Sequence, residues 1–252
     1  YYLTPKPNWQ LSVFDVGHGT MILITKDNEG FVYDLGPIYF NRFTRIYSTL
    51  KPYLENNQIE VAHTVISHDD KDHSGGLKEW IKLGYKDTFK ITQPEGVKSA
   101  CFAQKLNFNN LHITMSHKVG KHYSDNDNSC IVHISDGNNS VLLPGDITKL
   151  REQELIKDQT VLKSTVLVSP HHGSKTSSSE AFIEAVSPEV VIHSTAFKGQ
   201  WNLPHQEVLK RYEAINAQQF STAEHGQIIV SFYQDSYEIS SARAQSDWFL
   251  KD

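Results

Sequence analysis

The sequence predicts an α/β (α+β) fold in which two mixed β-sheets pack between layers of helices. Short apolar segments rich in β-branched residues recur along the 252-residue chain, and glycine, asparagine and aspartate separate them, as is typical of strands joined by turns. Segments with helical periodicity alternate with these strands, and both halves of the chain show this alternation. The repetition indicates two sheets, each covered by helices.

The first half of the chain leads through short strands to a buried strand that precedes a polar motif. The expected elements are strands at 11–16, 21–25 and 31–35, a helix at 46–55, a strand at 61–66, a helix at 77–81, and strands at 89–92 and 111–115. Pro52 is expected to kink or break its helix, because proline removes a backbone hydrogen bond. Strands at 131–135 and 141–143 then flank the hairpin turn at 136–139.

The second half repeats the alternation. The expected elements are a helix at 149–156, a strand at 165–168, a helix at 178–186, a strand at 190–193, a helix at 205–215, and strands at 228–232 and 237–240. We expect residues 1–252 to form one domain with its motifs at about 9–233. The tail at 242–252 is polar apart from Trp248–Leu250, and is either a docking segment or a frayed end.

Composition sets limits on the class of protein. The chain has no apolar run of about 18 residues and no signal-type amino terminus, so the polypeptide as given is expected to be soluble. Its net charge of −5 argues against nonspecific coating of nucleic acid, which depends on lysine and arginine. Cys101 and Cys130 allow at most one disulfide and leave the cellular compartment open. We expect each cysteine to be a small buried residue.

The most informative motif is Ser67-His-Asp-Asp-Lys-Asp-His-Ser-Gly-Gly76, directly after the apolar run at 61–66. Side chains of an extended chain alternate, so His68, Asp70 and Asp72 are expected to share one face, with His73 on the following turn. Imidazole and carboxylate groups together suit Zn²⁺, Mn²⁺ or iron and match Ca²⁺ poorly. The alternative is a charged surface loop, which would not require this donor set behind a core strand.

Two further strand ends carry similar groups. The apolar segment at 141–143 leads to Gly145-Asp146, and the strand at 165–168 leads to the turn that contains His171 and His172. Three strands that deliver histidine and aspartate from their carboxyl ends would provide enough ligands for two metal ions.

These motifs together resemble the metallo-β-lactamase-fold hydrolases. The segments that carry the resemblance are His68-x-Asp70-x-Asp72-His73, Gly145-Asp146 and His171-His172-Gly173-Ser174. The segments 14–19, 33–36, 128–130 and 175–178 narrow it to the carboxy-terminal hydrolase domain of the ComEC family of DNA-uptake channel proteins. The resemblance runs from about Trp9 to about Phe232 and implies an αββα sandwich with a two-metal site at the edge of its sheets.

The resemblance also implies a set of metal ligands. His68 and Asp70 would bind one metal ion, and Asp146 would bridge the two ions. The second ion would be held by Asp72, His73 and His172. Many fold relatives have histidine at the position of Asp70, and a family histidine usually stands where this chain has Asn128. The first site would therefore be weaker, or completed by water or Asn128.

Other residues receive roles near this centre. His171 is a ligand, a general acid or an orienting neighbour of His172, and His205 is a proton donor or phosphate contact unless it is a surface residue at a helix start. Asp34 would hold a histidine ligand in the required tautomer, and Asp15 belongs to a glycine-flanked turn near the substrate. Catalytic roles would fall to Asp72, His171 and His205. A phosphate cradle is expected from Ser174, Lys175 and Thr176, although the following serines also fit a helix N-cap.

Some histidines and aromatic residues have simpler explanations. His133, His193 and His225 are expected to be structural. Exposed aromatic residues can stack unpaired bases, whereas most aromatic residues pack in cores. Both interpretations stay open for Tyr39, Phe40, Phe43 and Trp201.

The resemblance implies a metal-dependent nuclease that degrades the DNA strand not taken up during natural transformation. Two divalent ions, Mn²⁺ or Zn²⁺, would lower the pKa of a water molecule and polarise the scissile phosphate. The partners would be DNA, single-stranded in the simplest case, and the membrane channel portion of a longer protein. The domain would lie on the outer, periplasmic side of the bacterial cytoplasmic membrane without inserting into it.

Two rival functions remain. One is a phosphodiesterase for a small ester, similar to phosphorylcholine esterases, which the His-x-Asp-x-Asp-His variant and the acidic net charge favour. The other is a metal-poor domain that binds DNA or the channel without cutting, which Asn128 keeps open.

Overall fold

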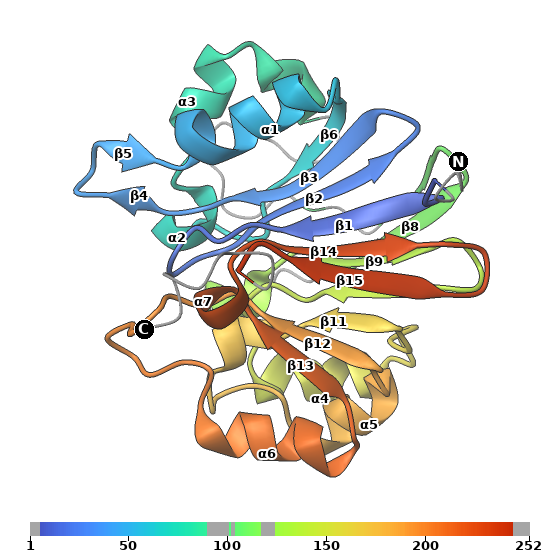
Figure 1. Ribbon diagram of the computed structural model, residues 1–252. Helices are drawn as coiled ribbons and strands as arrows, with labels where there is room; N and C mark the ends of the chain where they lie inside the picture. The colour runs from blue at the N-terminus through green and yellow to red at the C-terminus, as the bar shows by residue number, and fades with distance from the viewer. Residues whose placement is uncertain (1–5, 90–100, 102–103, 117–123, 244–252) are drawn as a thin grey trace.

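The computed structural model describes residues 6–89, 101, 104–116 and 124–243. Two large sheets lie face to face, and helices cover their outer faces (Figure 1). The first sheet has the strand order β15-β14-β1-β2-β3-β6, and the second has the order β13-β12-β11-β10-β9-β8-β7. Parallel and antiparallel neighbours occur in both sheets. The predicted sandwich of two mixed sheets between helices is therefore confirmed.

The elements follow one another closely along the chain. The strands are β1 (Trp9–Val13), β2 (Met21–Lys26), β3 (Glu29–Leu35), β4 (Ile38–Tyr39), β5 (Phe43–Thr44), β6 (Glu60–Val65), β7 (Gln104–Phe108), β8 (Leu111–Ser116), β9 (Ile131–Ser135), β10 (Ser140–Leu143), β11 (Val166–Val168), β12 (Val190–His193), β13 (Gln218–Ser221), β14 (Ile228–Phe232) and β15 (Tyr237–Ser241). The helices are η1 (Ile46–Leu50), α1 (Lys51–Asn56), α2 (Lys71–Ser74), α3 (Leu77–Lys82), η2 (Tyr85–Thr88), η3 (Asn126–Asn128), α4 (Lys149–Lys157), η4 (Pro170–Gly173), α5 (Glu180–Val186), α6 (Gln206–Ala214) and α7 (Thr222–His225).

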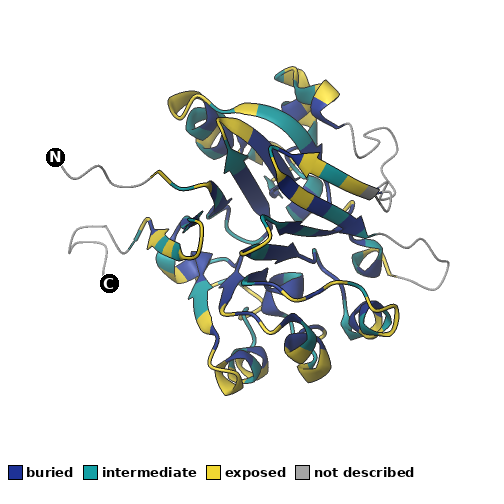
Figure 2. Ribbon diagram, turned by 90° about the vertical axis from the view of Figure 1, so that its right-hand side faces the viewer, coloured by how far each residue is buried: buried dark blue, intermediate teal, exposed yellow. Residues whose placement is uncertain are grey.

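The strands read as continuous apolar runs because both of their faces are buried. Ile22 and Ile24 of β2 pack in the core between the sheets, whereas Leu23 packs on the other face against the layer that holds α1 and α3. In the second sheet, Val166 and Val168 face the central core, and Leu167 joins the cluster under α4 and α5. Burial is therefore deepest in the strands, while exposed residues gather on the outer sides of the helices (Figure 2).

A hydrogen bond joins the two sheets, and a disulfide links the segments that precede β7 and β9 of the second sheet. The buried Tyr33 hydroxyl of the first sheet lies 2.7 Å from the Cys130 carbonyl oxygen, to which it donates a hydrogen bond. Cys101 and Cys130 are both buried, as expected, and they form a disulfide across 29 residues of sequence. The pairing settles a question that the sequence left open.

Most predicted elements appear with shifted ends, and four short strands were not predicted. The expected strand at 11–16 ends at Val13. Phe89 follows η2 and is not in a strand, and the rest of the segment expected at 89–92 lies outside the described residues. The missed strands are β4, β5, β7 and β13. Pro52 stands at the start of α1, where a π-helical turn passes into an α-helix.

Two further expectations concern the ends of the chain and the membrane. Residues 244–252 of the polar tail, with Trp248–Leu250, lie outside the described residues. Within the described ranges, no helix combines the length and the apolar character that crossing a bilayer requires.

Candidate metal centre

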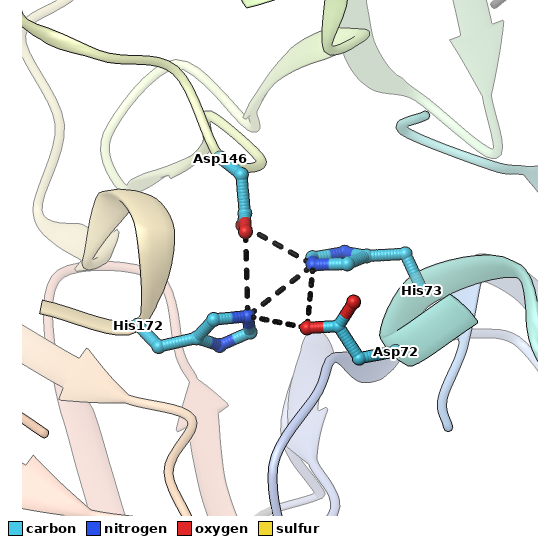
Figure 3. A group of neighbouring side chains, drawn as sticks. All are labelled: Asp72, His73, Asp146 and His172. Atoms are coloured by element: carbon cyan, nitrogen blue, oxygen red, sulfur yellow. Dashed lines mark hydrogen bonds and ion pairs between the residues drawn. The ribbon is translucent and has the colours of Figure 1, made fainter. Parts of the chain in front are cut away.

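Three segments that follow strands meet at one end of the sandwich. α2 follows β6 and carries Asp72 and His73, the loop after β10 carries Asp146, and η4 after β11 carries His172. β10 and β11 run parallel, so their carboxyl ends lie at the same sheet edge. Figure 3 shows the four side chains pointing toward one point.

The four side chains offer donor atoms at close range. His73 Nε2 lies 3.2 Å from Asp146 Oδ1 and 3.3 Å from His172 Nε2. His172 Nε2 in turn lies 3.2 Å from Asp72 Oδ2. One ligand atom from each residue lies within 4.8 Å of every other. Two imidazoles and two carboxylates in this arrangement match the donor preference of a transition-metal dication.

A buried carboxylate, that of Asp34, fixes the tautomer of His73. Its Nδ1 lies 2.7 Å from Asp34 Oδ2, and both side chains are fully buried. A carboxylate only accepts hydrogen bonds, so Nδ1 keeps a proton, and Nε2 is the nitrogen that can offer its lone pair to a metal ion. Asp34 is held in turn by Ser67, whose backbone N and Oγ donate to the two carboxylate oxygens at 2.6 and 2.8 Å. The expected role of Asp34 therefore has a geometric basis.

His172 is oriented by the backbone. Its Nδ1 donates to the Ser194 carbonyl oxygen at 2.8 Å, which leaves Nε2 free to bind a metal ion. His171 and His172 both adopt left-handed backbone conformations, with φ angles of 50° and 53°. Such conformations are costly for residues other than glycine and concentrate at functional sites. The backbone at His171 and His172 therefore departs from a regular helix.

The position of Asp146 depends on Gly145, the residue before it. Gly145 has φ +63°, and a Cβ atom at this position would come within 2.7 Å of the Ser129 side chain. The close approach lets the Asp146 backbone N donate to Ser129 Oγ at 3.0 Å. A larger residue at position 145 would push the loop, and Asp146 with it, away from the centre.

Electrostatics hold these groups in a charged state. Burial alone would raise the pKa of Asp146, but His73 and His172 keep it well below the usual value. Burial opposes charge on His172, yet Asp146 and Asp72 raise its pKa to about 9. Without metal, two protonated imidazoles then face each other across two carboxylates. A divalent cation can replace these protons and satisfy all four donors, so the residues fit a metal ion.

His68 and Asp70 lie beside this cluster but are less constrained. His68 Nε2 is buried and has no hydrogen-bond partner among the described residues, although Asp70 Oδ2 lies 3.4 Å away. His68 Nδ1 donates to Ser67 Oγ at 2.9 Å, because the proton of that hydroxyl goes to Asp34. The side chain of Asp70 is half exposed. An unpartnered imidazole nitrogen next to a carboxylate is available for a second cation.

The local backbone differs from the expected alternation. The prediction that the motif continues as an extended strand is wrong, because β6 ends at Val65 and α2 begins at Lys71. Asp70 is the residue before the helix, and Asp72 and His73 follow on its first turn. The helix allows two consecutive side chains to reach the same centre from one short segment.

His171 is at the edge of the cluster. Its Nε2 lies 3.8 Å from Asp146 Oδ2 and 3.4 Å from Asn126 Nδ2, and its Nδ1 lies 3.1 Å from Thr176 Oγ1. Burial lowers the pKa of His171 and favours the neutral ring. Asn126 therefore supplies an amide beside His171. The Asn128 Oδ1 atom is buried without a hydrogen-bond partner in the described structure.

A cleft of about 760 Å³ opens above the cluster. Its lining residues are His18, Pro37, Ile38, Tyr39, Asp70, Lys71, Asp72, Asp146, His171, Ser174, Lys175, Gln200, Trp201, Leu203 and His205. The structure thus places predicted residues from four segments around one cavity. His205 lines the cleft and caps the N-terminus of α6, where its Nδ1 accepts from the Glu207 backbone N at 3.3 Å.

His18 and Trp201 lie together in the cleft wall, and the sequence did not predict this pairing. The His18 ring packs between Trp201 and His172, with centroid distances of 4.3 and 4.6 Å. His18 Nε2 also lies 3.4 Å from Asp72 Oδ2, and burial lowers the pKa of His18 to about 4. The turn at Gly17-His18-Gly19 was the available signal, but nothing in the sequence connects it with the loop of Trp201.

The remaining predicted residues have structural partners. Asp15 Oδ2 forms an ion pair with Arg243 at 2.7 Å. His133, His193 and His225 bond to the Lys163 carbonyl oxygen, Ser169 and the Ser221 segment respectively. The serine run behaves as the N-cap alternative suggests, because Ser179 Oγ accepts from the Phe182 backbone N. Ser174 and Thr176 hydroxyls lie 2.9 Å apart, beside His171.

Comparison with known proteins identifies the family. The model of the metallo-beta-lactamase superfamily matches residues 14–192, which include all four residues of the cluster. The chain belongs to this superfamily. Its fold is the one that the sequence resemblance implied.

Similar curated proteins point to competence. The chain is 36% identical over 255 residues to "Recombination protein 2" of Haemophilus influenzae, covering 98% of this chain and 32% of that protein. It is 29% identical over 215 residues to "Competence protein ComA" of Neisseria gonorrhoeae, covering 83% of this chain and 30% of that protein. The chain thus spans about a third of the length of these relatives. They fit the predicted ComEC-like competence domain, which is confirmed.

Solved structures show the same fold at low sequence identity. The metallo-beta-lactamase fold protein YhfI from Bacillus subtilis has a TM-score of 0.55 and 13% identity, covering 84% of this chain and 95% of that one. CmlA, a diiron beta-hydroxylase from Streptomyces venezuelae, has a TM-score of 0.53 and 12% identity, covering 91% of this chain and 55% of that one. At this identity the likeness concerns the fold alone.

Proposed function

We propose that this superfamily member is a metal-dependent phosphodiesterase that degrades the DNA strand not transported during natural transformation. The observation that carries the proposal is the convergence of Asp72, His73, Asp146 and His172 beneath a cleft. The names of the relatives, one a recombination protein and one a competence protein, supply the biological context. A divalent ion such as Mn²⁺ or Zn²⁺, held by these donors, supplies Lewis acidity toward a phosphate ester and toward water.

Residues of the cleft are suited to hold a phosphodiester. Lys71 and Lys175 line it and offset the negative charge of the aspartates around the centre. His205 Nδ1 accepts a hydrogen bond from the backbone, so the neutral ring carries its proton on Nε2. That N–H is available to a phosphate oxygen or a leaving oxygen. Ser174 adds a hydroxyl at the same wall.

His171 is suited to move a proton. It lies at the rim of the cluster, 3.8 Å from Asp146, and its side chain is 27% exposed to the cleft side of the molecule. A lowered pKa keeps the ring neutral near pH 7, so one nitrogen can accept a proton while the other donates. We assign His171 the proton transfer and His205 the contact with the phosphate. Asp72 supplies one carboxylate of the cluster, and its Oδ2 lies 3.4 Å from His18 Nε2.

The proposal extends to the compartment and the partners. The Cys101–Cys130 disulfide supports a location on the oxidising, outer side of the cytoplasmic membrane. Because the chain covers about a third of its relatives, we infer that a membrane channel portion belongs to the same full-length protein. Single-stranded DNA released at the channel would then be the substrate.

A second candidate is a small phosphodiester such as a choline-phosphate conjugate. A cleft of about 760 Å³ has the size of a small-molecule site, and Trp201 and Tyr39 offer ring faces that attract quaternary ammonium groups. Asp70 lies in the same cleft and would add charge attraction.

One set of assays tests both candidates. Purified protein, loaded with Mn²⁺ or Zn²⁺, is incubated with end-labelled single-stranded DNA, a chromogenic phosphodiester and a choline-phosphate ester. We expect cleavage of DNA and of the chromogenic ester that Asp146→Asn abolishes and that Asp87→Asn, an exposed control, retains. Intact DNA in the presence of metal, with wild type and Asp146→Asn alike, refutes the nuclease. Cleavage of the choline ester alone selects the second candidate.

A further inference from the structure

An aromatic and basic surface lies next to the cleft. β4 and β5 form a two-stranded hairpin that projects from the body of the molecule (Figure 1). At the tip and base of this hairpin, Phe40 is 87% exposed, Phe43 is 65% exposed and Tyr47 is 52% exposed. With Arg42 and Arg45 these residues form what we call the hairpin patch. Large exposed aromatic side chains of this kind mark interaction surfaces.

The charge of the hairpin patch differs from that of the whole chain. The chain carries a net charge of −5, yet residues 36–54 contain no aspartate or glutamate and include Arg42, Arg45 and Lys51. Arg45 lies over the Tyr39 ring, 5.7 Å from its centroid. In the described part of the chain neither guanidinium forms an ion pair. Both therefore remain available to an anionic partner.

The hairpin patch encloses a hollow with an unused acceptor. This hollow measures about 580 Å³ and is lined by patch residues and by Glu79 of α3. Glu79 Oε2 is buried and has no hydrogen-bond partner among the described residues. A buried unpaired carboxylate oxygen is costly unless a donor reaches it, and the exocyclic amino group of a base is such a donor. Aromatic faces, guanidinium groups and this acceptor match the parts of a nucleotide.

The hairpin patch is continuous with the candidate active site. Tyr39 lines both the hollow and the cleft above the metal donors. Lys71 also lines the cleft, and its Nζ lies 3.4 Å from Asn41 Oδ1 at the hairpin tip. A chain whose phosphate occupies the cleft can thus continue over Tyr39 to the patch.

We propose that the hairpin patch binds single-stranded nucleic acid that extends out of the cleft. Unpaired bases stack on Phe40 and Phe43, and backbone phosphates contact Arg42 and Arg45. Exposed rings favour single strands, because the bases of a duplex already stack on one another and offer no free face. This inference rests on the proposed function for the part of the strand inside the cleft, but the binding itself can be measured without cleavage.

The test measures affinity and cleavage separately. In chelator, fluorescence anisotropy follows binding of a labelled oligothymidylate of about 20 nucleotides and of a duplex of equal length. We expect Phe40→Ala/Phe43→Ala to weaken single-strand binding by at least about tenfold and to leave hydrolysis of the chromogenic diester unchanged. Arg42→Ala/Arg45→Ala should flatten the dependence of log affinity on log salt by about 1.4, since each phosphate contact contributes about 0.7.

Matched controls and outcomes separate this inference from the proposed function. Val161→Ala/Ile215→Ala removes exposed apolar groups elsewhere, and Lys105→Ala/Lys210→Ala removes two exposed charges elsewhere. Unchanged single-strand affinity in both patch variants overturns the inference, whether or not wild type cleaves DNA. An equal loss of duplex binding also overturns it. Patch-dependent binding by a protein that cleaves nothing refutes the nuclease alone.

Discussion

The substitution Asp34→Asn tests how the metal centre is held together. The backbone N–H of Ser67 donates to Asp34 Oδ1, and an N–H can only donate, so the amide oxygen must stay at this position. The new amide nitrogen then replaces Oδ2, 2.7 Å from His73 Nδ1. It can only donate, so His73 must accept at Nδ1 and carry its proton on Nε2. Nε2 is the atom that faces Asp146 and His172.

The magnitude follows from the loss of one ligand in its binding tautomer. Removal of a carboxylate that orients a histidine ligand lowers metal affinity by about 10- to 100-fold, which corresponds to about 1.4–2.7 kcal/mol. The fold itself should persist, because asparagine retains hydrogen bonds to Ser67 and His73. Asparagine also tolerates the left-handed backbone of position 34, where φ is 60°.

Metal affinity is measured by competition with a chromogenic chelator, and ¹⁵N NMR of the imidazole ring reports the tautomer of His73. We expect weaker binding together with a proton on Nε2. The exposed substitution Asp87→Asn serves as the control. A folded Asp34→Asn protein with unchanged affinity and with the proton still on Nδ1 would refute the reasoning, because the proposed orientation would then not depend on the carboxylate.

Three further predictions concern metal stoichiometry and stability. His68→Ala should remove a weaker second equivalent of Mn²⁺ or Zn²⁺ in equilibrium dialysis and leave the first, and loss of both equivalents would contradict two separable sites. Cys101→Ser should lower the free energy of unfolding by about 3–4 kcal/mol in urea titrations, because the disulfide closes a loop across 29 residues. His193 is buried and its pKa is lowered from 6.5 to about 4, so the unfolded state binds its proton first as the pH falls. Its contribution is therefore complete above about pH 6.5 and declines toward pH 4. The stability of wild type relative to His193→Gln should fall by about 3 kcal/mol between pH 7 and pH 4, and parallel pH profiles would exclude this role.

The side chains of the candidate metal centre could be located in the sequence because their signal is local. His68 to His73 follow one another directly, and Gly145-Asp146 and His171-His172 each follow an apolar strand. A strand end fixes where a side chain emerges, and the parallel pairing of β10 and β11 brings two such ends together. The fold class was predictable for the same reason, since each buried strand is an apolar run.

The parts that were missed depend on contacts between distant segments. β13 contains Gln218 and Gln219 and becomes a strand only because β12 offers it a parallel edge. The His18 ring packs against Trp201 in the cleft, although Trp201 lies 183 positions later in the chain (201 − 18). Asn126 comes to lie beside His171 because the short helix η3 turns its amide toward that ring. None of these pairings has a periodic pattern in the sequence.

The two candidate metal subsites differ in how firmly their donors are held. His73 and His172 are buried, and a carboxylate and a backbone carbonyl fix their tautomers, so ordering these ligands costs little when a metal ion binds. Asp70 keeps rotational freedom because its side chain is half exposed at the wall of the cleft. We therefore expect the four-donor subsite to hold a metal ion more firmly than the subsite of His68 and Asp70.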